Sequence, residues 1–414
     1  MSVRTRLGLI AGGLIALVLF SAVIGACTGR QPAPTPTPTR TPRPVETKAS
    51  SLNRTPTATV APTDTPAPTP TPLPPAATAT PAATPAPAPT VDMSVIVPGR
   101  DPNISPYTGL KPADPKILER RPMAIKVANQ ESVHPQSGLS KADIVVESPV
   151  EYSETRYTVL FHSQDAERIG SVRSARLIDV ELPAIFDAVL AYSGGVQPVV
   201  DKLMALDFSK LVLDETAAGA GFFRDPTIVA PDNLFANTVK LAEVVAKKGL
   251  NQRPQPAAGW VFAPVAPPAG ATASSVTIPY PRFQVKWTYD AASGRWKREM
   301  GGAAHVDKAT GELLSAADVV ILTAPHVKTL ILEHGTAMEG QGQACRNCSI
   351  EIQLWGEGPA KVLRDGKVYE GKWIRSGRRE SFRIVDGAGK DIPLKPGNSW
   401  WQVVPPDLKL TVVP

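Results

Sequence analysis

The pattern of apolar and polar positions divides the chain into three parts. An apolar run without a charged residue extends from Leu7 to Val23. From Gln31 to Thr90 the chain consists mostly of proline, threonine and alanine, and it has no aromatic residue. Beyond Val91, apolar residues recur at the spacings that strands and helices require. Only this last part is expected to bury enough apolar surface to form a folded core.

From about residue 93 to residue 263 the pattern predicts strands mixed with helices. Short apolar stretches with little polar alternation are typical of strands that are buried on both faces. Helices are predicted where apolar residues recur every three or four positions. The predicted strands are 123–127, 143–147, 157–161 and 188–192, and the predicted helices are 175–186, 198–206 and 237–247. Within the first of these helices, Pro183 indicates a kink or a helix boundary.

From about residue 264 onward the pattern is dominated by short strands. The dipeptides Ser293-Gly294 and Asp365-Gly366 are turn signals between apolar stretches, and the second is the strongest hairpin signal in the chain. The predicted strands are 285–289, 295–298, 318–322, 329–333, 350–355, 360–364, 367–373, 381–385 and 401–404. This density of strands predicts a small antiparallel sheet, sandwich or barrel.

Together these elements predict a mixed α+β fold class. We expect an N-terminal α/β domain with a central sheet, followed by a smaller and mostly antiparallel β domain. The stretch 252–272 is rich in proline, alanine and glycine, and we place the boundary there. The predicted segments are a signal peptide at 1–26, a tether at 27–92, and domains at 93–263 and 264–414.

The start of the chain predicts a lipid anchor. Arg4 and Arg6 precede the apolar run, which ends in Ile24-Gly25-Ala26-Cys27. This ending resembles the lipobox of bacterial lipoproteins, which implies cleavage before Cys27 and acylation of its thiol. An uncleaved N-terminal anchor is the alternative, and both interpretations place the rest of the chain outside the cytoplasm. The expected location is the outer face of the cytoplasmic membrane.

The proline-rich tether separates this anchor from the domains. Its composition prevents a packed core and favours polyproline II. Its 60 residues, at about 3.1 Å each, reach on the order of 190 Å when fully extended.

The charge distribution excludes a nucleic-acid partner. The net charge is +6 and the isoelectric point is about 9.1. However, seven of the 44 basic residues and two of the 38 acidic residues lie before residue 92, which leaves 37 against 36 in the folded part. A nearly neutral body lacks the positive field that nucleic acids require.

The arginines of the first domain predict an anion site. Arg173 and Arg176 are three positions apart at the expected start of a helix. Guanidinium groups and the free N–H groups of a helix N-terminus suit phosphate or carboxylate. The alternative is that the arginines form structural ion pairs with Asp143, Glu147, Glu151, Glu154 and Asp179. The predicted ligand-binding residues are Arg156, Arg173, Arg176, Arg224, Asp143, Asp225 and Asn233.

No catalytic residue, metal site or cofactor is predicted. The five histidines lack the paired spacing of metal ligands. With Cys27 assigned to the lipid, Cys345 and Cys348 remain as a Cys-x-x-Cys pair. A local disulfide is expected outside the cytoplasm, with a redox motif and a zinc site as the alternatives.

Several stretches resemble the YerB-type bacterial lipoproteins, whose halves are known as the N- and C-terminal domains of unknown function 3048. The matching stretches are PYTGL at 106–110, RP at 121–122, PQSGLSKAD at 135–143, IGSVRSAR at 169–176, FRD at 223–225, HVD at 305–307, TGEL at 310–313, GKV at 366–368, GKW at 371–373, PG at 396–397 and WQVVP at 401–405. One departure is Asp232, where the family has histidine. The resemblance covers the chain beyond about residue 100 and implies no established activity.

These observations favour a binding or assembly factor of the cell envelope over an enzyme. Two alternatives stay open. The order of elements around 169–195 is similar to that of LytR-CpsA-Psr phosphotransferases, which implies a phosphotransferase or hydrolase acting on polyprenyl-phosphate-linked cell-wall precursors. The other is a protein-docking adaptor that uses an apolar patch of the C-terminal domain. Trp355, Trp373, Trp400 and Trp401 are its candidates, although we expect them in the core.

The expected partners are the membrane, through the lipid anchor, and a cell-wall component or envelope protein. The oligomeric state does not follow from the sequence.

Overall fold

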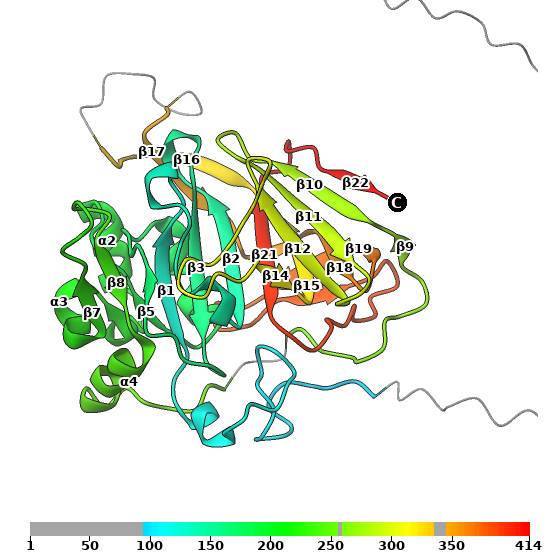
Figure 1. Ribbon diagram of the computed structural model, residues 1–414, viewed down its shortest axis with the longest axis horizontal. Helices are drawn as coiled ribbons and strands as arrows, with labels where there is room; N and C mark the ends of the chain where they lie inside the picture. Colours follow the sequence, from blue (N-terminus) through cyan, green and yellow to red (C-terminus); the bar gives the residue numbers. More distant parts are fainter. Residues whose placement is uncertain (1–93, 256–258, 335–344) are drawn as a thin grey trace, which may run out of the picture. The chain divides into compact units, whose positions relative to one another are not determined.

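The computed structural model describes residues 94–255, 259–334 and 345–414 (Figure 1). All described residues belong to one compact unit, Pro85–Pro414. The predicted signal peptide, Cys27 and the tether lie outside the described residues.

One large sheet extends through this unit and contains strands from both halves of the sequence. Its strands are β1 (Met123–Ala128), β2 (Ile144–Pro149), β3 (Thr155–Phe161), β5 (Val189–Ala191), β6 (Val212–Leu213), β9 (Ala271–Thr272), β15 (Asp318–Thr323), β18 (Gly356–Arg364), β19 (Lys367–Arg375), β20 (Arg383–Val385) and β21 (Ser399–Val404). Their order in the sheet is β20-β19-β18-β15-β21-β2-β3-β1-β5-β6, and β9 pairs with β19.

A second, antiparallel sheet lies in the C-terminal half. It consists of β10 (Ser275–Pro279), β11 (Gln284–Asp290), β12 (Arg295–Met300), β13 (Ala303–Ala304), β14 (Ser315–Ala316) and β22 (Thr411–Val413). The strand order is β13-β12-β11-β10-β22, with β14 paired to β12. The predicted hairpin around Ser293-Gly294 is confirmed, because β11 and β12 pair antiparallel.

Two smaller sheets flank the large one. The first contains β4 (Ile169–Gly170), β7 (Phe222–Arg224) and β8 (Leu234–Ala236) in the order β4-β8-β7. The second contains β16 (His326–Leu332) and β17 (Cys348–Ile352), which pair only with each other among the described strands. We call the described residues 326–334 and 345–352 the β16–β17 arm. In Figure 1 its two strands lie at the top of the view, above β3 and β2.

Helices are short and gather in the first half. The α-helices are α1 (Leu182–Ile185), α2 (Gln197–Met204), α3 (Glu215–Ala218) and α4 (Thr238–Lys247). The 3-10 helices are η1 (Pro115–Glu119), η2 (Glu131–Val133), η3 (Leu139–Lys141), η4 (Glu151–Ser153), η5 (Leu177–Val180), η6 (Ser209–Leu211) and η7 (Gly219–Gly221). Figure 1 shows α2, α3 and α4 on the side of β5, β7 and β8.

Two of the three predicted helices are confirmed, and the third is interrupted near Pro183, where the sequence indicated a kink or a helix boundary. α2 and α4 match the predictions, and Asn237 caps α4 by accepting the N–H of Lys240 at 3.0 Å. The predicted helix at 175–186 is instead divided into η5 and α1. Pro183 lies in the first turn of α1, and a proline there cannot continue a preceding helix because it lacks the N–H.

The mixed α+β fold class is confirmed, and the two halves share the large sheet. β21, near the end of the chain, lies between β15 and β2 and runs parallel to both. The boundary near residue 263 falls between β8 and β9. The division into two domains there stays a prediction.

The tryptophans belong mainly to the core. Trp400 and Trp401 are consecutive in β21 and therefore point to opposite faces of the sheet. Trp400 packs against Tyr157 and Trp287, whereas Trp401 packs against Trp260 and Phe186. Trp355 differs, because it is 47% exposed. The buried tryptophans are Trp260, Trp287, Trp296, Trp373, Trp400 and Trp401.

The hairpin predicted from Asp365-Gly366 is also confirmed. β18 and β19 pair antiparallel, and Arg364 is opposite Lys367. Asp365 and Gly366 have φ values of 50° and 68°. Positive φ at both central residues is the requirement of the two-residue turn that joins twisted strands, and this explains the local signal.

Candidate functional site

Three of the predicted arginines meet near the start of β3. Arg156 lies in β3, whereas Arg173 and Arg176 lie between β4 and η5. The N–H of Arg173 donates to the carbonyl oxygen of Lys126 at 3.0 Å, and β1 in turn pairs with β3. Arg156 Nη1 donates to the Ser174 carbonyl oxygen at 2.9 Å. We call Arg156, Arg173 and Arg176 the arginine cluster.

Arg176 contacts two carboxylates that come from different halves of the chain. Its Nε donates to Glu151 Oε2 at 2.7 Å, and its Nη2 donates to Glu151 Oε1. Its Nη1 lies 3.3 Å from Glu333 Oε2. Glu151 begins η4, and Glu333 directly follows β16. All three side chains are buried, so Arg176 joins the first half to the β16–β17 arm.

The ion pair of Arg156 is longer than the ion pairs of Arg176. The one ion pair of Arg156 among the described residues joins Nη2 to Glu151 Oε1 at 3.8 Å, which is beyond hydrogen-bond distance. Burial and the nearby charge of Arg176 lower the pKa of Arg156 to about 10. The guanidinium is therefore still charged at neutral pH, in surroundings that oppose its charge.

Arg173 is held by the backbone of Pro231 and the side chain of Asp232. Its guanidinium donates to the Pro231 carbonyl oxygen and to Asp232 Oδ1. Gln130 Nε2 donates to the same carboxylate oxygen at 3.2 Å. The Asp232 carboxylate thus places a negative charge against the arginine cluster.

A buried ion pair lies beneath the cluster. Lys126 Nζ is 2.9 Å from Asp179 Oδ1, and both side chains are fully buried. Burial lowers the pKa of Lys126, and the charge of Asp179 opposes that shift. Asp179 Oδ2 also accepts the N–H of Arg176 at 2.7 Å. That N–H is therefore not free for a ligand, contrary to what a helix N-terminus at Arg176 implied.

Arg224, Asp225 and Asn233 lie beside the cluster but bind one another or other residues. Arg224 donates to Asn233 Oδ1 at 2.8 Å and to Glu215 Oε1 at 2.6 Å. Asp225 accepts from Arg168 Nη2 at 2.6 Å. Hydrogen bonds from Thr227, followed by that from Arg168, lower the pKa of Asp225 to about 2. Asn233 follows Asp232 in the chain and so connects this exposed group to Arg173.

Asp143 is not brought to the arginines. It accepts the N–H groups of His162 at 2.5 Å and Ser163 at 3.0 Å. β2 and β3 pair antiparallel, so that Ser148 is opposite Arg156 at one end and Ile144 is opposite Leu160 at the other. Asp143 and Arg156 therefore lie at opposite ends of this strand pair. Burial raises the pKa of Asp143, against the hydrogen bonds from Ser163.

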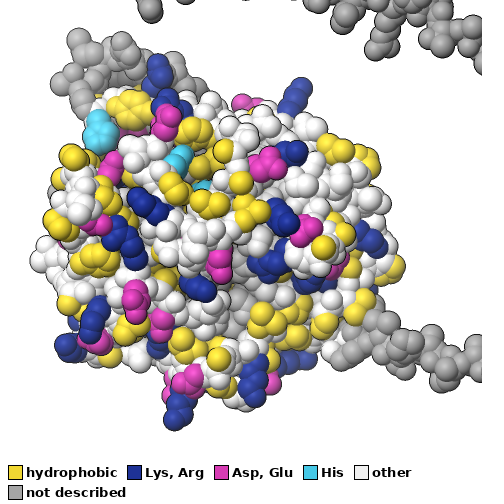
Figure 2. Space-filling view, in the orientation of Figure 1, with side chains coloured by type: hydrophobic (Ala, Val, Ile, Leu, Met, Phe, Trp, Pro, Cys, Tyr) yellow, Lys and Arg dark blue, Asp and Glu magenta, His cyan; other side chains and the backbone are white. Residues whose placement is uncertain are grey.

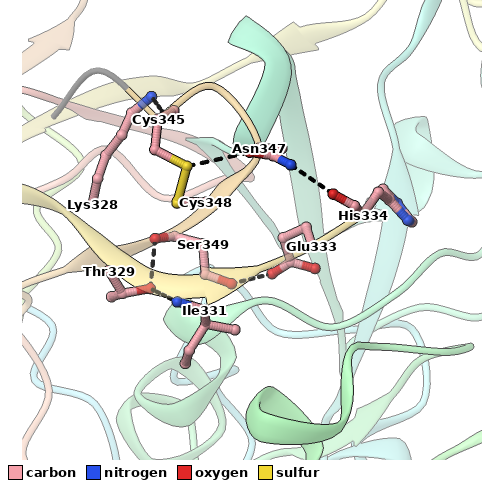
Figure 3. Close-up of a disulfide and its surroundings, with 9 residues drawn as sticks. All are labelled: Lys328, Thr329, Ile331, Glu333, His334, Cys345, Asn347, Cys348 and Ser349. Atoms are coloured by element: carbon pink, nitrogen blue, oxygen red, sulfur yellow. Dashed lines mark hydrogen bonds between the residues drawn. A yellow bond between two sulfur atoms is a disulfide. The ribbon is translucent and has the colours of Figure 1, made fainter. Parts of the chain in front are cut away.

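A disulfide lies at the end of the β16–β17 arm where Leu332 is opposite Cys348 (Figure 3). Cys345 and Cys348 are joined, and Asn347 between them donates to the His334 carbonyl oxygen at 2.6 Å. The N–H of Glu333 donates to the Asn347 carbonyl oxygen at 2.9 Å, and Ser349 Oγ donates to the Glu333 carboxylate. These contacts determine where the Glu333 carboxylate points.

A second polar cluster, which the sequence did not reveal, is buried between the two halves. Arg298 Nη2 donates to Glu147 Oε2 at 2.8 Å, and both side chains are fully buried. Arg298 Nε donates to His305 Nδ1 at 2.9 Å, and His305 Nε2 lies 2.8 Å from Gln136 Oε1. Burial, and then the charge of Arg298, hold the pKa of His305 well below its usual value.

Two of the stretches that resemble the family, 135–143 and 305–307, contribute to this cluster, so they are the part of the sequence that could have indicated it. Besides the pair of Gln136 and His305, Asp307 accepts the N–H groups of Gly138 at 3.0 Å and Ser140 at 2.8 Å. The two stretches therefore hold the halves of the chain together.

In the described residues there is no cluster of three or more histidine, cysteine or acidic side chains that could hold a metal ion. Nor does any described helix have the length and hydrophobicity needed to cross a bilayer. On the face shown in Figure 2, basic, acidic and apolar side chains are interspersed.

Each half of the folded part matches one domain of the same protein family. Residues 107–251 match the N-terminal domain, and residues 276–401 the C-terminal domain, of a protein family of unknown function, DUF3048. The chain belongs to this family, and the resemblance inferred from the sequence is confirmed.

One relative and one solved structure that are similar to this chain carry the name YerB. The candidate lipoprotein YerB of Bacillus subtilis (strain 168) is 29% identical over 309 residues, which cover 73% of this chain and 86% of that protein. The crystal structure of the YerB protein from Bacillus subtilis has a TM-score of 0.61 at 26% identity, covering 75% of this chain and 99% of that chain. This homology supports the interpretation of the chain as a lipoprotein of unknown function.

Proposed function

We propose that the protein is a membrane-anchored lipoprotein of the cell envelope that binds an anionic envelope component through the arginine cluster. Cys27 carries the lipid, and the folded part lies on the outer face of the cytoplasmic membrane. Homology to the candidate lipoprotein YerB supports the anchor, and the lipobox-like ending of the apolar run supports Cys27 as its site.

The observation that carries the anion site is the environment of Arg156. This guanidinium is 11% exposed, lies beside two further arginines, and shares its one carboxylate with Arg176. Gathering like charges in a partly buried place is unfavourable, and such arrangements are frequent at functional sites. A phosphate or carboxylate group would accept hydrogen bonds from the planar guanidinium groups and offset their charge.

The carboxylates at the cluster favour binding over group transfer. Glu151, Asp232 and Glu333 each contact an arginine of the cluster, so none of them is free to act as a general base. Glu154, which precedes β3, pairs with Arg282 at 3.5 Å instead.

The anchor is tested by metabolic labelling. Cells that express the full-length chain are grown with radioactive palmitate. We expect label on the wild-type protein and none on Cys27→Ser, because the thiol is the acceptor of the lipid. Equal labelling of both proteins, or none on the wild type, would contradict the proposed anchor.

The anion site is tested by calorimetry on the full-length chain in detergent micelles, with pyrophosphate as the probe. Arg156→Met is expected to weaken binding by about tenfold or more, because a hydrogen bond to a charged group contributes about 1.5–3 kcal/mol. Arg383→Met is the matched control, since Arg383 lies in β20, is exposed and pairs with Asp391. Unchanged affinity in Arg156→Met, with both variants folded by circular dichroism, would rule out the cluster as the site.

A further inference from the structure

The β16–β17 arm closes the arginine cluster by way of Glu333. Besides the ion pair of Glu333 with Arg176, the N–H of Tyr152 donates to the Arg346 carbonyl oxygen of the arm at 2.9 Å. Within the described residues, the arm pairs with no other strand. Its disulfide joins Cys345 to Cys348, both within the arm, and so does not fasten the arm to the cluster. The arm therefore forms a sheet of its own that meets the cluster through polar contacts, and its Ile331, Ile350 and Ile352 also pack against the apolar cores beside it.

The two carboxylates on Arg176 are held with different strength. Glu151 accepts two hydrogen bonds from the guanidinium, whereas Glu333 makes a looser ion pair at 3.3 Å. The shifts in pKa agree with this contrast. Burial opposes ionisation of both, but the hydrogen bonds and charge of Arg176 lower the pKa of Glu151. For Glu333 burial prevails and raises the pKa, and the charge of Glu151 adds to the shift. Glu333 is the carboxylate that an incoming anion would replace at the lower cost.

We infer that Glu333 is an internal competitor for the anion site: an anionic ligand displaces its carboxylate from Arg176, and the β16–β17 arm moves away from the cluster. This inference rests on the proposed function and adds its regulation.

Charge balance supports the displacement. Three guanidinium groups contact the carboxylates of Glu151, Asp232 and Glu333. When Glu333 leaves, one positive charge loses its partner, and a bound anion restores the balance. The freed donor is Arg176 Nη1, which also donates to the Ala175 carbonyl oxygen at 2.9 Å. Arg156 Nη2 and Arg176 Nη2 both lie near the same oxygen, Glu151 Oε1. Two neighbouring guanidinium edges fit a phosphate or carboxylate group that presents two oxygens.

Access to the cluster also requires a movement. The side chains of Arg156 and Arg176 are 11% and 5% exposed in the closed arrangement. A phosphate group cannot form several hydrogen bonds with guanidinium groups that are covered to this extent. Displacement of the arm uncovers them without rearranging the strands of the large sheet.

The test compares the affinity for pyrophosphate of the full-length wild type, Glu333→Gln and Glu351→Gln. Glutamine keeps an acceptor for Ser349 Oγ but removes the charge that repels an anion at Arg176. We expect Glu333→Gln to bind about tenfold more tightly than the wild type, because like charges a few ångströms apart interact strongly in a buried site. Glu351 lies in β17 of the same arm, so Glu351→Gln removes an equal charge and should bind like the wild type.

Hydrogen exchange supplies a readout that needs no variant. The N–H of Tyr152 bonds to Arg346 of the arm, so pyrophosphate should speed its exchange in the wild type. Suppose that pyrophosphate binds the wild type and Glu333→Gln with equal affinity and leaves the exchange at Tyr152 unchanged. This result would overturn the inference that Glu333 competes for the site, and it would leave the proposed function intact. Absence of pyrophosphate binding in all three proteins would overturn both.

Discussion

Replacement of Arg298 by methionine is expected to lower the free energy of unfolding by about 3–5 kcal/mol. The guanidinium is fully buried, pairs with Glu147 and donates to His305, and it lies 4.3 Å from the centre of the Trp400 ring. Methionine preserves part of the packing volume but leaves the Glu147 carboxylate buried without its cation. The cost arises from that unpaired charge rather than from the loss of an attraction.

Denaturation by guanidinium chloride measures this effect on the full-length chain. Arg282→Met is the matched control, because Arg282 is half exposed and its ion pairs with Glu131 and Glu154 are 3.6 and 3.5 Å long. Its loss should cost less than about 1 kcal/mol. The double variant Glu147→Gln/Arg298→Met should regain part of the stability, since it buries no charge. Equal losses of unfolding free energy in Arg298→Met and Arg282→Met would contradict this account of the buried pair of Arg298 and Glu147.

The stability of the protein is expected to fall by about 1.4 kcal/mol for each pH unit between 5 and 8 through Asp318 alone. This residue begins β15 and is fully buried. Its Oδ1 accepts the N–H of Lys395 at 2.8 Å, and its Oδ2 has no hydrogen-bond partner. Burial raises the pKa of Asp318 to about 8, from its ordinary value of about 3.8.

The sign follows from the protons bound in each state. Between these two pKa values the folded state holds a proton on Asp318 that the unfolded state has lost. The contribution to stability is therefore complete below about pH 4 and disappears as the pH rises through 8. Asp318→Asn keeps an oxygen for the N–H of Lys395 and removes the titration.

Unfolding free energies at pH 5 and pH 8 decide this prediction. The wild type should lose about 4 kcal/mol more than Asp318→Asn over this range. Asp201→Asn, at an exposed position in α2, controls for the removal of one carboxylate. The same pH slope in wild type and Asp318→Asn would show that Asp318 is ionised in the folded protein.

Features set by short-range chemistry could be predicted from the sequence. The turn at Asp365-Gly366 needs positive φ at two adjacent residues, and those residue types tolerate it. α2 and α4 combine an apolar face with a suitable first turn, and β1, β2 and β3 are apolar stretches of strand length. At 175–186 the apolar spacing of a helix is present, and Pro183 interrupts the backbone hydrogen bonds, as its expected role as a kink or helix boundary implied.

The candidate site was predicted in part. Arg173 and Arg176 were found because they are close in sequence and suit an anion. Asp143 was grouped with them, but the antiparallel register of β2 and β3 places it at the far end of the strands from Arg156. Glu333 and Arg298 were not found, because a partner that is distant in the sequence leaves no local pattern.

By itself, the sequence determined the composition of the chain, its near-neutral folded part, the local turns and strands, and the membership of the family. Only the tertiary structure decided that β21 lies between β15 and β2, that Arg298 reaches Glu147, and that Glu333 covers Arg176. The physical reason is that propensity and periodicity act over a few residues. Strand register and buried ion pairs instead depend on the packing of segments that are far apart in the chain.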